Sequence, residues 1–470
     1  MTTSTSIYLV GTLELASKYR YGLTSRGAPL YLFRPYDEDQ NDYIVGCSER
    51  DTSKNQLAVV EVPVASSVAG SGKPRGNLVR LLGPVGEPEA ERTALLQHYC
   101  PVSTKPLTAP LPEPDTSNDA GRMEISAATG WTVLHVDPPG CRDIDDAIAW
   151  NPSQRRWAIV IADVAAAVPA VSAIDARARA IGSTFYDLDG RVVRPMLPPE
   201  ISENSASLLP GQRRRGIALL FPEGTIADTW SLCWITVAHS YTYDSFATSE
   251  HAWMAKGQGS PPWSGVAMEP HDWIATQMIR YNAAAASLLK THSYGLLRVQ
   301  PPSDEAKTAT TTDIWPPELR HLLNERATYQ PADVTTDQGH AGLGLPAYAH
   351  ASSPLRRYAD LINQRALKTI LAGDSTRASE SPEIAEHLND RTTANRRWTR
   401  DLTFLTHVTP GRVHIIDVIP VSPTHVWVPI WGRLLRLRHA PTEPPTRIAI
   451  FCDPTKRNWK MRVLTAPAST

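Results

Sequence analysis

Long apolar runs are absent from this 470-residue sequence. A membrane-spanning helix needs roughly 18–20 consecutive apolar residues, so we expect no association with a membrane. The first residues, Met1–Ser6, contain neither a basic segment nor the apolar stretch of a secretory signal. We therefore expect a cytoplasmic protein.

Cysteine is scarce and scattered. No two of the five cysteines stand at CxxC spacing. An odd, dispersed set argues against a disulfide framework and against a cysteine-bound zinc site, and it fits a reducing compartment. These residues are Cys47, Cys100, Cys141, Cys233 and Cys452.

An excess of charge of either sign is also missing. The sequence has 47 basic and 48 acidic residues, which gives a net charge of −1. This balance excludes a histone-like protein, which binds nucleic acid through a large net positive charge. It leaves open a local basic channel, because attraction depends on where the charges lie.

Proline is abundant, with 40 residues, and it marks a boundary. Residues 96–120 include a proline-rich stretch without periodicity, which is typical of a stiff linker. Before it, residues 1–95 carry short β-branched and aromatic runs between turn residues, which predict a small β-barrel or sandwich. The expected strands cover residues 7–10, 30–33, 43–45, 57–62 and 78–82, and a helix is expected at residues 89–96.

The remainder divides into two further segments, which makes the chain a multidomain α+β protein. Residues 121–400 mix strand and helix patterns and predict one large α+β domain. Residues 401–470 return to short strands and suggest a small OB-like (S1-like) barrel, a fold-level guess. The central elements we expect are strands at 132–136 and 157–161 and helices at 173–180, 273–290 and 354–371.

An acidic turn between two apolar strands is the most chemically informative segment. Asp137, Asp143, Asp145 and Asp146 place four carboxylates within ten residues, after a Pro-Pro-Gly turn. Like charges this close raise one another's pKa unless a cation lies among them. Mg²⁺ prefers oxygen ligands, and two such ions about 4 Å apart can hold the attacking and leaving oxygens in phosphodiester hydrolysis.

Two other interpretations of this turn stay open. A solvated acidic loop explains the residues equally well when the turn is taken alone. An EF-hand is less favoured, since the glycine at the sixth loop position and the glutamate at the twelfth are both missing when counted from Asp143.

A second segment, Tyr348–Leu361, combines aromatic and basic residues. Ser353 followed by Pro354 predicts a helix that starts here, so Arg356 and Arg357 would lie in its first turn. There they would oppose the helix dipole, and we expect Arg356 to pair with Asp360 one turn later. A bound phosphate would compensate further, because guanidinium groups match phosphate oxygens. A surface Arg–Asp pair is the alternative.

Arginines also lie near tryptophans toward the C-terminus. Arg396, Arg397 and Arg400 surround Trp398, and Arg433 follows Trp431. Cations beside exposed aromatic rings are typical of a channel for single-stranded nucleic acid. Core tryptophans beside a solvated helix face are the alternative.

Together the acidic and basic segments resemble the ribonuclease II / ribonuclease R family, whose catalytic RNB domain degrades single-stranded RNA from its 3′ end. The four aspartates match the spacing of its Asp-x5-Asp-x-Asp-Asp signature. Tyr348–Leu361 matches its Tyr-x-His-x-x-Ser-Pro-x-Arg-Arg-Tyr-x-Asp-Leu signature. Further blocks occur in the right order, and the resemblance covers residues 130 to 370. It implies a central RNB-type domain between the two smaller β-rich segments.

The resemblance also implies roles for individual residues. Asp137, Asp143 and Asp146, together with Asp145, would bind two Mg²⁺ ions, for which Mn²⁺ is a possible substitute. Asp145 would be the residue whose loss the chemistry tolerates least, and Arg356 would grip the scissile phosphate. Tyr186 would clamp the terminal nucleotide, for which a core tyrosine is the alternative. The RNA-binding set would be Tyr186, Tyr348, His350, Arg356 and Arg357.

One departure from the family bears on function. Ala275 and Thr276 stand where the family has glutamates, one of which contacts the 3′-terminal nucleotide. We therefore expect a divalent-metal-dependent 3′→5′ exoribonuclease that releases 5′-mononucleotides from single-stranded RNA. A catalytically weak or inactive RNA-binding protein with the same fold is the alternative.

Overall fold

The computed structural model describes most of the 470 residues and groups them into two compact units. The first comprises Met1–Ser103, Asp187–Arg191 and Ala394–Thr470, and the second Thr104–Tyr186 and Val192–Thr393. The four-segment division at residues 95, 120 and 400 stays a prediction. The described residues are 6–37, 39–63, 73–103, 110–224, 228–255, 268–302, 326–333, 338–374, 380–409, 411–422, 424–437, 446–453 and 464–467.

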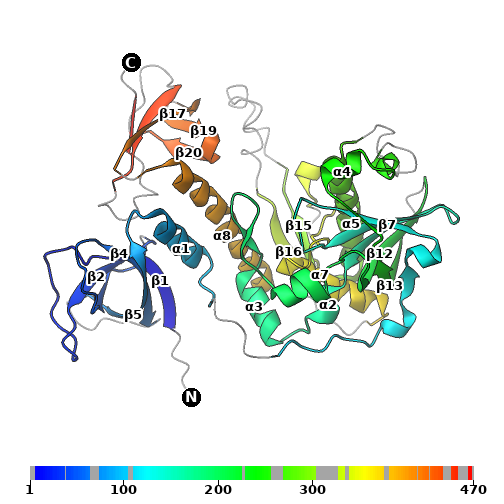
Figure 1. The fold of residues 1–470 in the computed structure, drawn as a ribbon, viewed down its shortest axis with the longest axis horizontal. Coiled ribbons are helices and arrows are strands. Elements are labelled where there is room, and N and C mark those ends of the chain that lie inside the picture. The colour runs from blue at the N-terminus through cyan, green and yellow to red at the C-terminus, as the bar shows by residue number, and fades with distance from the viewer. Residues whose placement is uncertain are drawn as a thin grey trace. The chain divides into compact units, whose positions relative to one another are not determined.

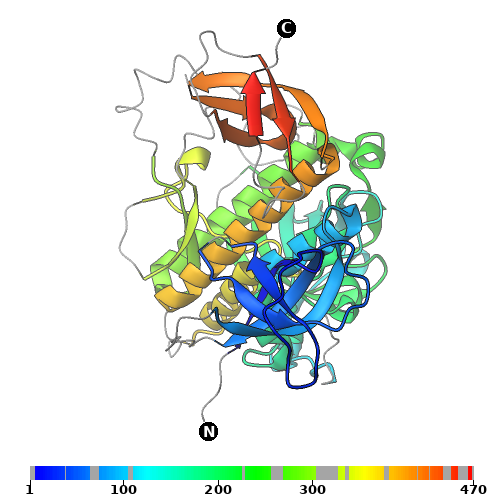
Figure 2. The ribbon, with the colours of Figure 1, turned by 90° about the vertical axis from the view of Figure 1, so that its left-hand side faces the viewer.

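The N-terminal part of the first unit is a closed five-stranded barrel, in the order β1-β2-β3-β5-β4 (Figures 1 and 2). All five expected strands are confirmed. Many of their buried residues form one core that includes Phe33, Val45 and Val60. At Gly11 any Cβ would lie 2.1 Å from the Arg34 carbonyl oxygen, so only glycine fits where β1 crosses β2. The strands are β1 (Ser6–Leu13), β2 (Leu30–Pro35), β3 (Tyr43–Gly46), β4 (Gln56–Pro63) and β5 (Arg75–Pro84).

The expected helix that follows the barrel is confirmed as α1 (Pro88–Tyr99). Pro88 occupies the first turn, where its missing N–H costs nothing. The helix packs against β1, β4 and β5, and Ala90 and Ala94 join Leu57 and Val59 in a second small core. Its last residue, Tyr99, donates a hydrogen bond to the Asp401 carboxylate on α8 (Pro382–His407), one continuous helix in Figure 2.

The C-terminal strands form two three-stranded sheets in the described part of the chain, in the orders β17-β21-β22 and β18-β19-β20. A closed OB-like barrel is therefore not seen there, and residues 454–463 of this segment lie outside the described residues. Trp398 and Trp431 are buried, which favours core tryptophans over RNA-stacking ones. The strands are β17 (Val413–Asp417), β18 (Ile419–Ser422), β19 (His425–Val428), β20 (Arg433–Arg436), β21 (Arg447–Phe451) and β22 (Leu464–Pro467).

The second unit is built on a seven-stranded mixed sheet in the order β14-β7-β8-β9-β12-β13-β6. The five central strands pair antiparallel, and the two outer strands β14 and β6 pair parallel to their neighbours. The strands expected at 132–136 and 157–161 are confirmed as β7 and β9. The bounds are β6 (Met123–Ile125), β7 (Thr132–Val136), β8 (Asp146–Asn151), β9 (Arg156–Ala162), β12 (Arg213–Pro222), β13 (Thr229–Thr236) and β14 (His239–Tyr241).

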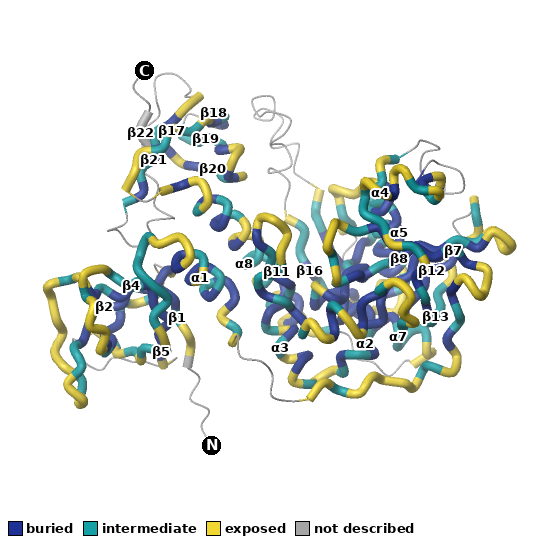
Figure 3. The backbone as a smooth tube through the Cα atoms, in the orientation of Figure 1, coloured by how far each residue is buried: buried dark blue, intermediate teal, exposed yellow. Residues whose placement is uncertain are grey.

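A large core of the second unit lies between this sheet and two helices, α5 and α7. Strands β7, β8 and β12 are largely buried in Figure 3. Trp273 and Leu289 of α5 and Leu367 of α7 pack on sheet residues such as Leu134 and Ile159. The helices expected at 173–180 and 273–290 are confirmed as α3 and α5. The remaining bounds are α2 (Val164–Ala167), α3 (Ala173–Ile181), α4 (Tyr243–Ala247), α5 (Pro270–His292), α7 (Tyr358–Leu371), β10 (Phe185–Tyr186), β11 (Val192–Arg194), β15 (Leu296–Val299) and β16 (Thr328–Pro331).

Among the described residues, no helix combines the length and the apolarity that crossing a bilayer requires.

Candidate active site

The four aspartates lie on the connection between β7 and β8. Asp137 directly follows β7, and its N–H donates to the Tyr241 carbonyl of β14 at 3.0 Å. Asp146 is the first residue of β8 and pairs opposite Ile161 of β9. Because both ends of the connection belong to the sheet, the carboxylates between them are held at the turn end of the β7–β8 hairpin.

Ser207 fixes the course of this connection. Its hydroxyl accepts a hydrogen bond from the Ile144 N–H at 3.0 Å and donates one to the Arg142 carbonyl at 2.7 Å. Ser207 and Ile144 are both buried. The turn is therefore an ordered part of the fold, which disfavours the solvated-loop interpretation.

Asp145 is the aspartate that meets the arginine segment. Its Oδ1 accepts a hydrogen bond from the Leu355 backbone N–H at 2.9 Å, and its Oδ2 lies 3.1 Å from Nε of Arg356. The residue is only 3% exposed. Two segments that the sequence singled out separately thus come together at one buried carboxylate.

The helix of the arginine segment begins later than expected. The prediction of a helix from Pro354 with Ser353 as N-cap is wrong, because α7 begins at Tyr358. Arg356 and Arg357 precede it, in a turn closed by the Ser353 carbonyl. The reason is tertiary: the Arg356 carbonyl accepts from the Thr184 N–H at 3.0 Å, which holds this backbone extended beside the strand that leads to Tyr186.

The expected pair between Arg356 and Asp360 is also wrong. Arg357 makes that contact, with its Nη2 2.9 Å from Oδ1 of Asp360, whose side chain is fully buried. The same Oδ1 accepts from the Ser353 N–H at 2.8 Å. Asp360 thus stabilises the turn and binds Arg357. Arg356 contacts Asp145 instead.

Arg356 keeps hydrogen-bonding capacity beyond Asp145. Its Nη2 donates to the Ser353 hydroxyl at 2.9 Å, and its side chain is 44% exposed. A guanidinium has five N–H donors, so two of them being used leaves a face that can meet an anion. The geometry suits a phosphate that approaches from the solvent side.

Tyr186 lies beside the aspartates, near Arg356. Its hydroxyl donates to Oδ2 of Asp143 at 3.2 Å, and the Cys141 thiol contacts Oδ1 of the same carboxylate at 3.3 Å. Burial and the neighbouring Asp143 raise the pKa of the Tyr186 phenol, so the hydroxyl stays protonated as a donor. The ring is partly buried and belongs to the two-residue strand β10.

The site concentrates negative charge in a poorly solvated place. Burial raises the pKa of Asp145 to about 7, against the opposing effect of Arg356. Burial, with Asp137 and Asp145 close by, raises the pKa of Asp146 well above its ordinary value. A divalent cation would remove this cost, since it favours the charged form of each carboxylate.

The donor set fits a hard cation, because all four side chains offer carboxylate oxygens, which Mg²⁺ prefers. Both oxygens of Asp145 already accept hydrogen bonds. The bonds of Asp145 come from a guanidinium and a backbone N–H, whereas those of Asp143 come only from a weak thiol donor and a tyrosine hydroxyl that a cation can displace. Asp137, Asp143 and Asp146 are therefore the residues best suited to bind Mg²⁺. In the described part of the chain, no three of the four aspartates bring ligand atoms within 4.8 Å of one another. Ion binding would thus draw them together or leave positions for water and substrate oxygens.

Tyr348 and His350 lie beneath the arginine turn. The Tyr348 hydroxyl accepts from the Asn282 side chain at 3.0 Å, and the ring is buried. Nδ1 of His350 lies 2.7 Å from the Tyr329 hydroxyl. Burial, with Arg357 nearby, lowers the pKa of His350 well below its ordinary value, so this ring is neutral. These internal contacts, like that of Arg357 with Asp360, favour support of the turn over direct contact with RNA.

One residue of the site escaped the sequence interpretation. Nδ1 of His135 lies 2.8 Å from Oδ2 of Asp137 and orients that carboxylate. The sequence feature that could have identified His135 is its spacing from Asp137. Residues two apart at the end of a strand lie on the same face. By itself that spacing is too common to identify a functional histidine.

The two positions without the family's glutamates lie on α5. Ala275 and Thr276 are partly buried. The Thr276 hydroxyl donates to the Asp272 carbonyl one turn earlier, at 2.8 Å. Neither side chain can supply a carboxylate to a terminal nucleotide.

Comparison with known proteins agrees with these observations. An RNB domain is matched by residues 127–252 and 267–373. Exoribonuclease 2 of Sodalis glossinidius is 28% identical over 357 residues, which is 58% of this chain and 55% of that protein. Exoribonuclease 2 of Yersinia pseudotuberculosis is 27% identical over 369 residues, or 61% of this chain and 56% of that protein. The chain thus spans about half the length of the curated relatives it matches.

Solved structures show the same fold. Mycoplasma genitalium RNase R, in complex with double-stranded RNA, is similar with a TM-score of 0.70 at 16% identity, over 98% of this chain and 95% of that one. Yeast Ssd1, described as a pseudonuclease, is similar with a TM-score of 0.68 at 18% identity, over 95% of this chain and 66% of that one. The multidomain α+β fold is therefore confirmed, and the chain belongs to the RNB-domain family.

Proposed function

We propose that this protein is a divalent-metal-dependent 3′→5′ exoribonuclease that hydrolyses single-stranded RNA to 5′-mononucleotides. The observation that carries the proposal is the contact between Arg356 Nε and Asp145 Oδ2 at 3.1 Å. It brings a phosphate-binding side chain and an acidic cluster suited to Mg²⁺ into one site.

Each charged side chain has a distinct role in this proposal. Asp137, Asp143 and Asp146 hold the cations, and Asp145 acts mainly by orienting Arg356. When bound, two divalent ions lower the pKa of the attacking water and offset charge on the leaving 3′ oxygen. Arg356 grips the scissile phosphate through its unused N–H groups and stabilises the charge that develops there. Mn²⁺ is expected to replace Mg²⁺, since both accept carboxylate and water ligands.

In this proposal, Tyr186 accounts for the preference for the 3′ end of the RNA. Its hydroxyl is tied to Asp143, so the ring is positioned beside the acidic cluster. Stacking of a base on such a ring tolerates any sequence and is worth roughly 1–3 kcal/mol per base. We propose that the 3′-terminal nucleotide stacks here. Direct RNA contacts of Tyr348, His350 and Arg357 stay a prediction, as does the cytoplasmic location.

A second candidate function is RNA binding without cleavage. It is favoured by the absence of carboxylates at Ala275 and Thr276 and by the structural likeness to a pseudonuclease. Against it, all four aspartates and Arg356 are present in the sequence, and Arg356 contacts Asp145. Loss of catalysis would be expected to remove one of these residues first.

Oligoribonucleotides labelled at either end separate the two functions. With purified protein and Mg²⁺, the enzyme releases the 3′ label first, as a mononucleotide, and shortens the 5′-labelled strand stepwise. A chelator stops both reactions. Retention of intact RNA on the protein under the same conditions indicates the binding protein instead.

A further inference from the structure

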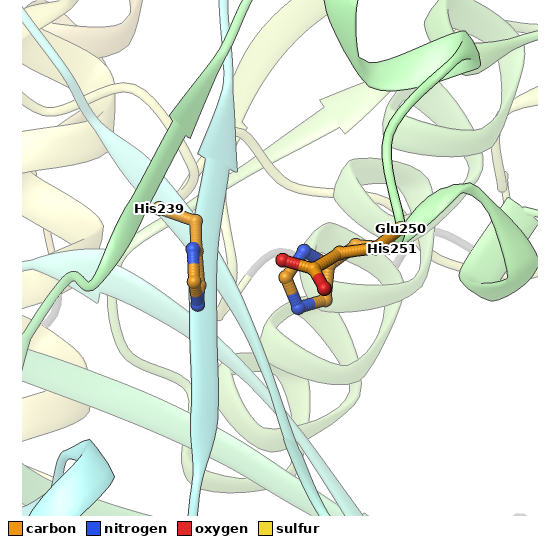
Figure 4. Close-up of side chains that lie close together, drawn as sticks. All are labelled: His239, Glu250 and His251. Carbon is orange, nitrogen blue, oxygen red and sulfur yellow. The ribbon is translucent and has the colours of Figure 1, made fainter.

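A histidine-rich cluster lies outside the acidic site. His239 is the first residue of β14, and Glu250 and His251 follow α4, just before a short 3₁₀ helix at Ala252–Ala255. One ligand atom from each side chain lies within 4.8 Å of the other two. Figure 4 shows His239 on its strand, facing Glu250 and His251. Among the described residues, no other group of three potential metal ligands is as close.

Local structure fixes the backbone that carries these side chains. Thr242 caps α4 through hydrogen bonds exchanged with Ser245, so the chain turns back directly after β14. Phe246 of α4 stacks on Trp273 with ring centroids 5.3 Å apart. The His251 N–H donates to the Ser249 hydroxyl at 3.2 Å. The approach of the two segments is therefore set by the fold, not by the three polar side chains.

The ring of His251 is oriented as in known metal sites. Its Nδ1 lies 2.8 Å from the Tyr241 hydroxyl, and its centroid is 4.4 Å from that of His239. In the tautomer whose Nδ1–H donates to the tyrosine oxygen, Nε2 carries the free lone pair. A histidine that binds a metal usually donates its other N–H to a neighbouring oxygen in this way.

We propose that His239, Glu250 and His251 form a second metal site, for a borderline transition-metal ion such as Zn²⁺. Two imidazoles and one carboxylate are a ligand set that Zn²⁺ accepts, with a fourth position left for water. Mg²⁺ prefers oxygen ligands alone, so this site and the aspartate site select different ions. Ligand atoms around tetrahedral Zn²⁺ lie about 3.4 Å apart, since the bonds are about 2.0–2.2 Å long. The exposed Glu250 side chain can close the difference by rotation.

The ion would act as a clamp near the acidic cluster. It would join β14 to the segment after α4, and Tyr241 connects this clamp to the aspartates. The Tyr241 hydroxyl contacts His251, and its carbonyl accepts the Asp137 N–H at 3.0 Å. Metal binding at the histidines thus stabilises the strand edge from which Asp137 projects.

The test is metal binding by the full chain, with no nuclease activity required. Protein freed of metal by a chelator is dialysed against Zn²⁺ with excess Mg²⁺, and bound zinc is measured by elemental analysis. We expect one Zn²⁺ per chain and visible absorption bands when Co²⁺ replaces it. His251→Gln should weaken binding by at least about a hundredfold, and Tyr241→Phe by about 10–100-fold because it removes the orienting hydrogen bond.

A second ligand variant and a control variant complete the test. Glu250→Gln alters an exposed side chain, so it folds while it loses a ligand and should also weaken binding. His271→Gln removes a histidine that lies outside the cluster and is 72% exposed, and it should leave Zn²⁺ binding unchanged. An unchanged zinc content in His251→Gln and Glu250→Gln, or complete displacement of Zn²⁺ by Mg²⁺, overturns the proposal. Because binding is the readout, failure here leaves the proposed nuclease function untouched.

Discussion

Nε of Arg356 lies 3.1 Å from Oδ2 of Asp145, and this contact joins residues 211 positions apart in the sequence. The Leu355 N–H donates to the other oxygen of the same carboxylate, so side chain and backbone of one turn converge on it. Asp145 therefore sets where the guanidinium lies relative to the remaining aspartates.

Asp145→Asn should abolish most cleavage without a comparable loss of RNA binding. The amide can still accept from Leu355 N–H, but it cannot pair with Arg356 as a carboxylate does. Loss of one preorganised charged contact typically lowers the rate by about 10²–10³-fold. Affinity, which depends mainly on cationic contacts with phosphates, should change by only a few-fold. Single-turnover rates and equilibrium RNA binding measure the two effects.

A matched variant controls for the loss of a negative charge. Asp119→Asn removes a carboxylate that pairs with Arg122 and Arg215 instead of the site residues. It should retain the wild-type rate. Equal losses of rate and affinity in Asp145→Asn would contradict the role assigned to that residue.

Substitution of the two adjacent arginines should affect different properties, the cleavage rate for Arg356 and the stability for Arg357. Arg356→Ala should reduce the rate and cost less stability than the second variant, since this side chain is 44% exposed and its partner Asp145, whose pKa is about 7, can take up a proton. Arg357→Ala should destabilise the fold by about 3–5 kcal/mol, because it leaves the buried Asp360 carboxylate without its ion pair. Thermal unfolding and cleavage rates, measured on both variants, distinguish them. A stable but inactive Arg357→Ala would show that Arg357 contacts substrate.

The sequence predicted the parts of this site and not their assembly. The barrel strands, α3 and α5 follow from hydrophobic periodicity, and the signatures identified the aspartates and arginines. Ser353-Pro354 is a good local signal for a helix start, yet the hydrogen bond from Thr184 to the Arg356 carbonyl overrides it. Such long-range backbone pairing leaves no local trace. The same holds for the choice of Arg357 over Arg356 as the partner of Asp360.

The metal-free protein should lose stability as pH rises from about 4 to about 7. Burial raises the pKa of Asp145 to about 7 in the folded chain, whereas an unfolded aspartate releases its proton near 4. The folded state therefore binds more protons in this window, and deprotonation costs on the order of 3–4 kcal/mol at the upper end.

Denaturant unfolding in a chelator, at several pH values, measures this slope. Asp145→Asn should show a smaller slope, because the group that titrates is gone. Mg²⁺ should raise the stability of the wild type most at the upper end of the window, where the carboxylates are charged. A wild-type profile that rises across the same window would contradict the effect of burial.

Two variants of Tyr186 should distinguish the role of its ring from the role of its hydroxyl. Tyr186→Phe keeps the stacking surface and loses the hydrogen bond to Asp143, so RNA affinity should change little. Tyr186→Ala should lose about 1–3 kcal/mol of binding free energy for the terminal base. Titration of a short RNA in Ca²⁺, without cleavage, provides both values. Equal affinity of the two variants would favour a purely structural tyrosine.

Sulfur substitution in the substrate tests the central claim most directly. A short RNA carries sulfur in place of a non-bridging oxygen at the 3′-terminal scissile phosphate, and its cleavage is compared in Mg²⁺ and in Mn²⁺, which binds sulfur better. If cations at Asp137, Asp143 and Asp146 hold this phosphate against Arg356, one sulfur diastereomer should react slowly in Mg²⁺ and recover in Mn²⁺. Equal rates in both metals for both diastereomers, or cleavage that continues in a chelator, would contradict the account.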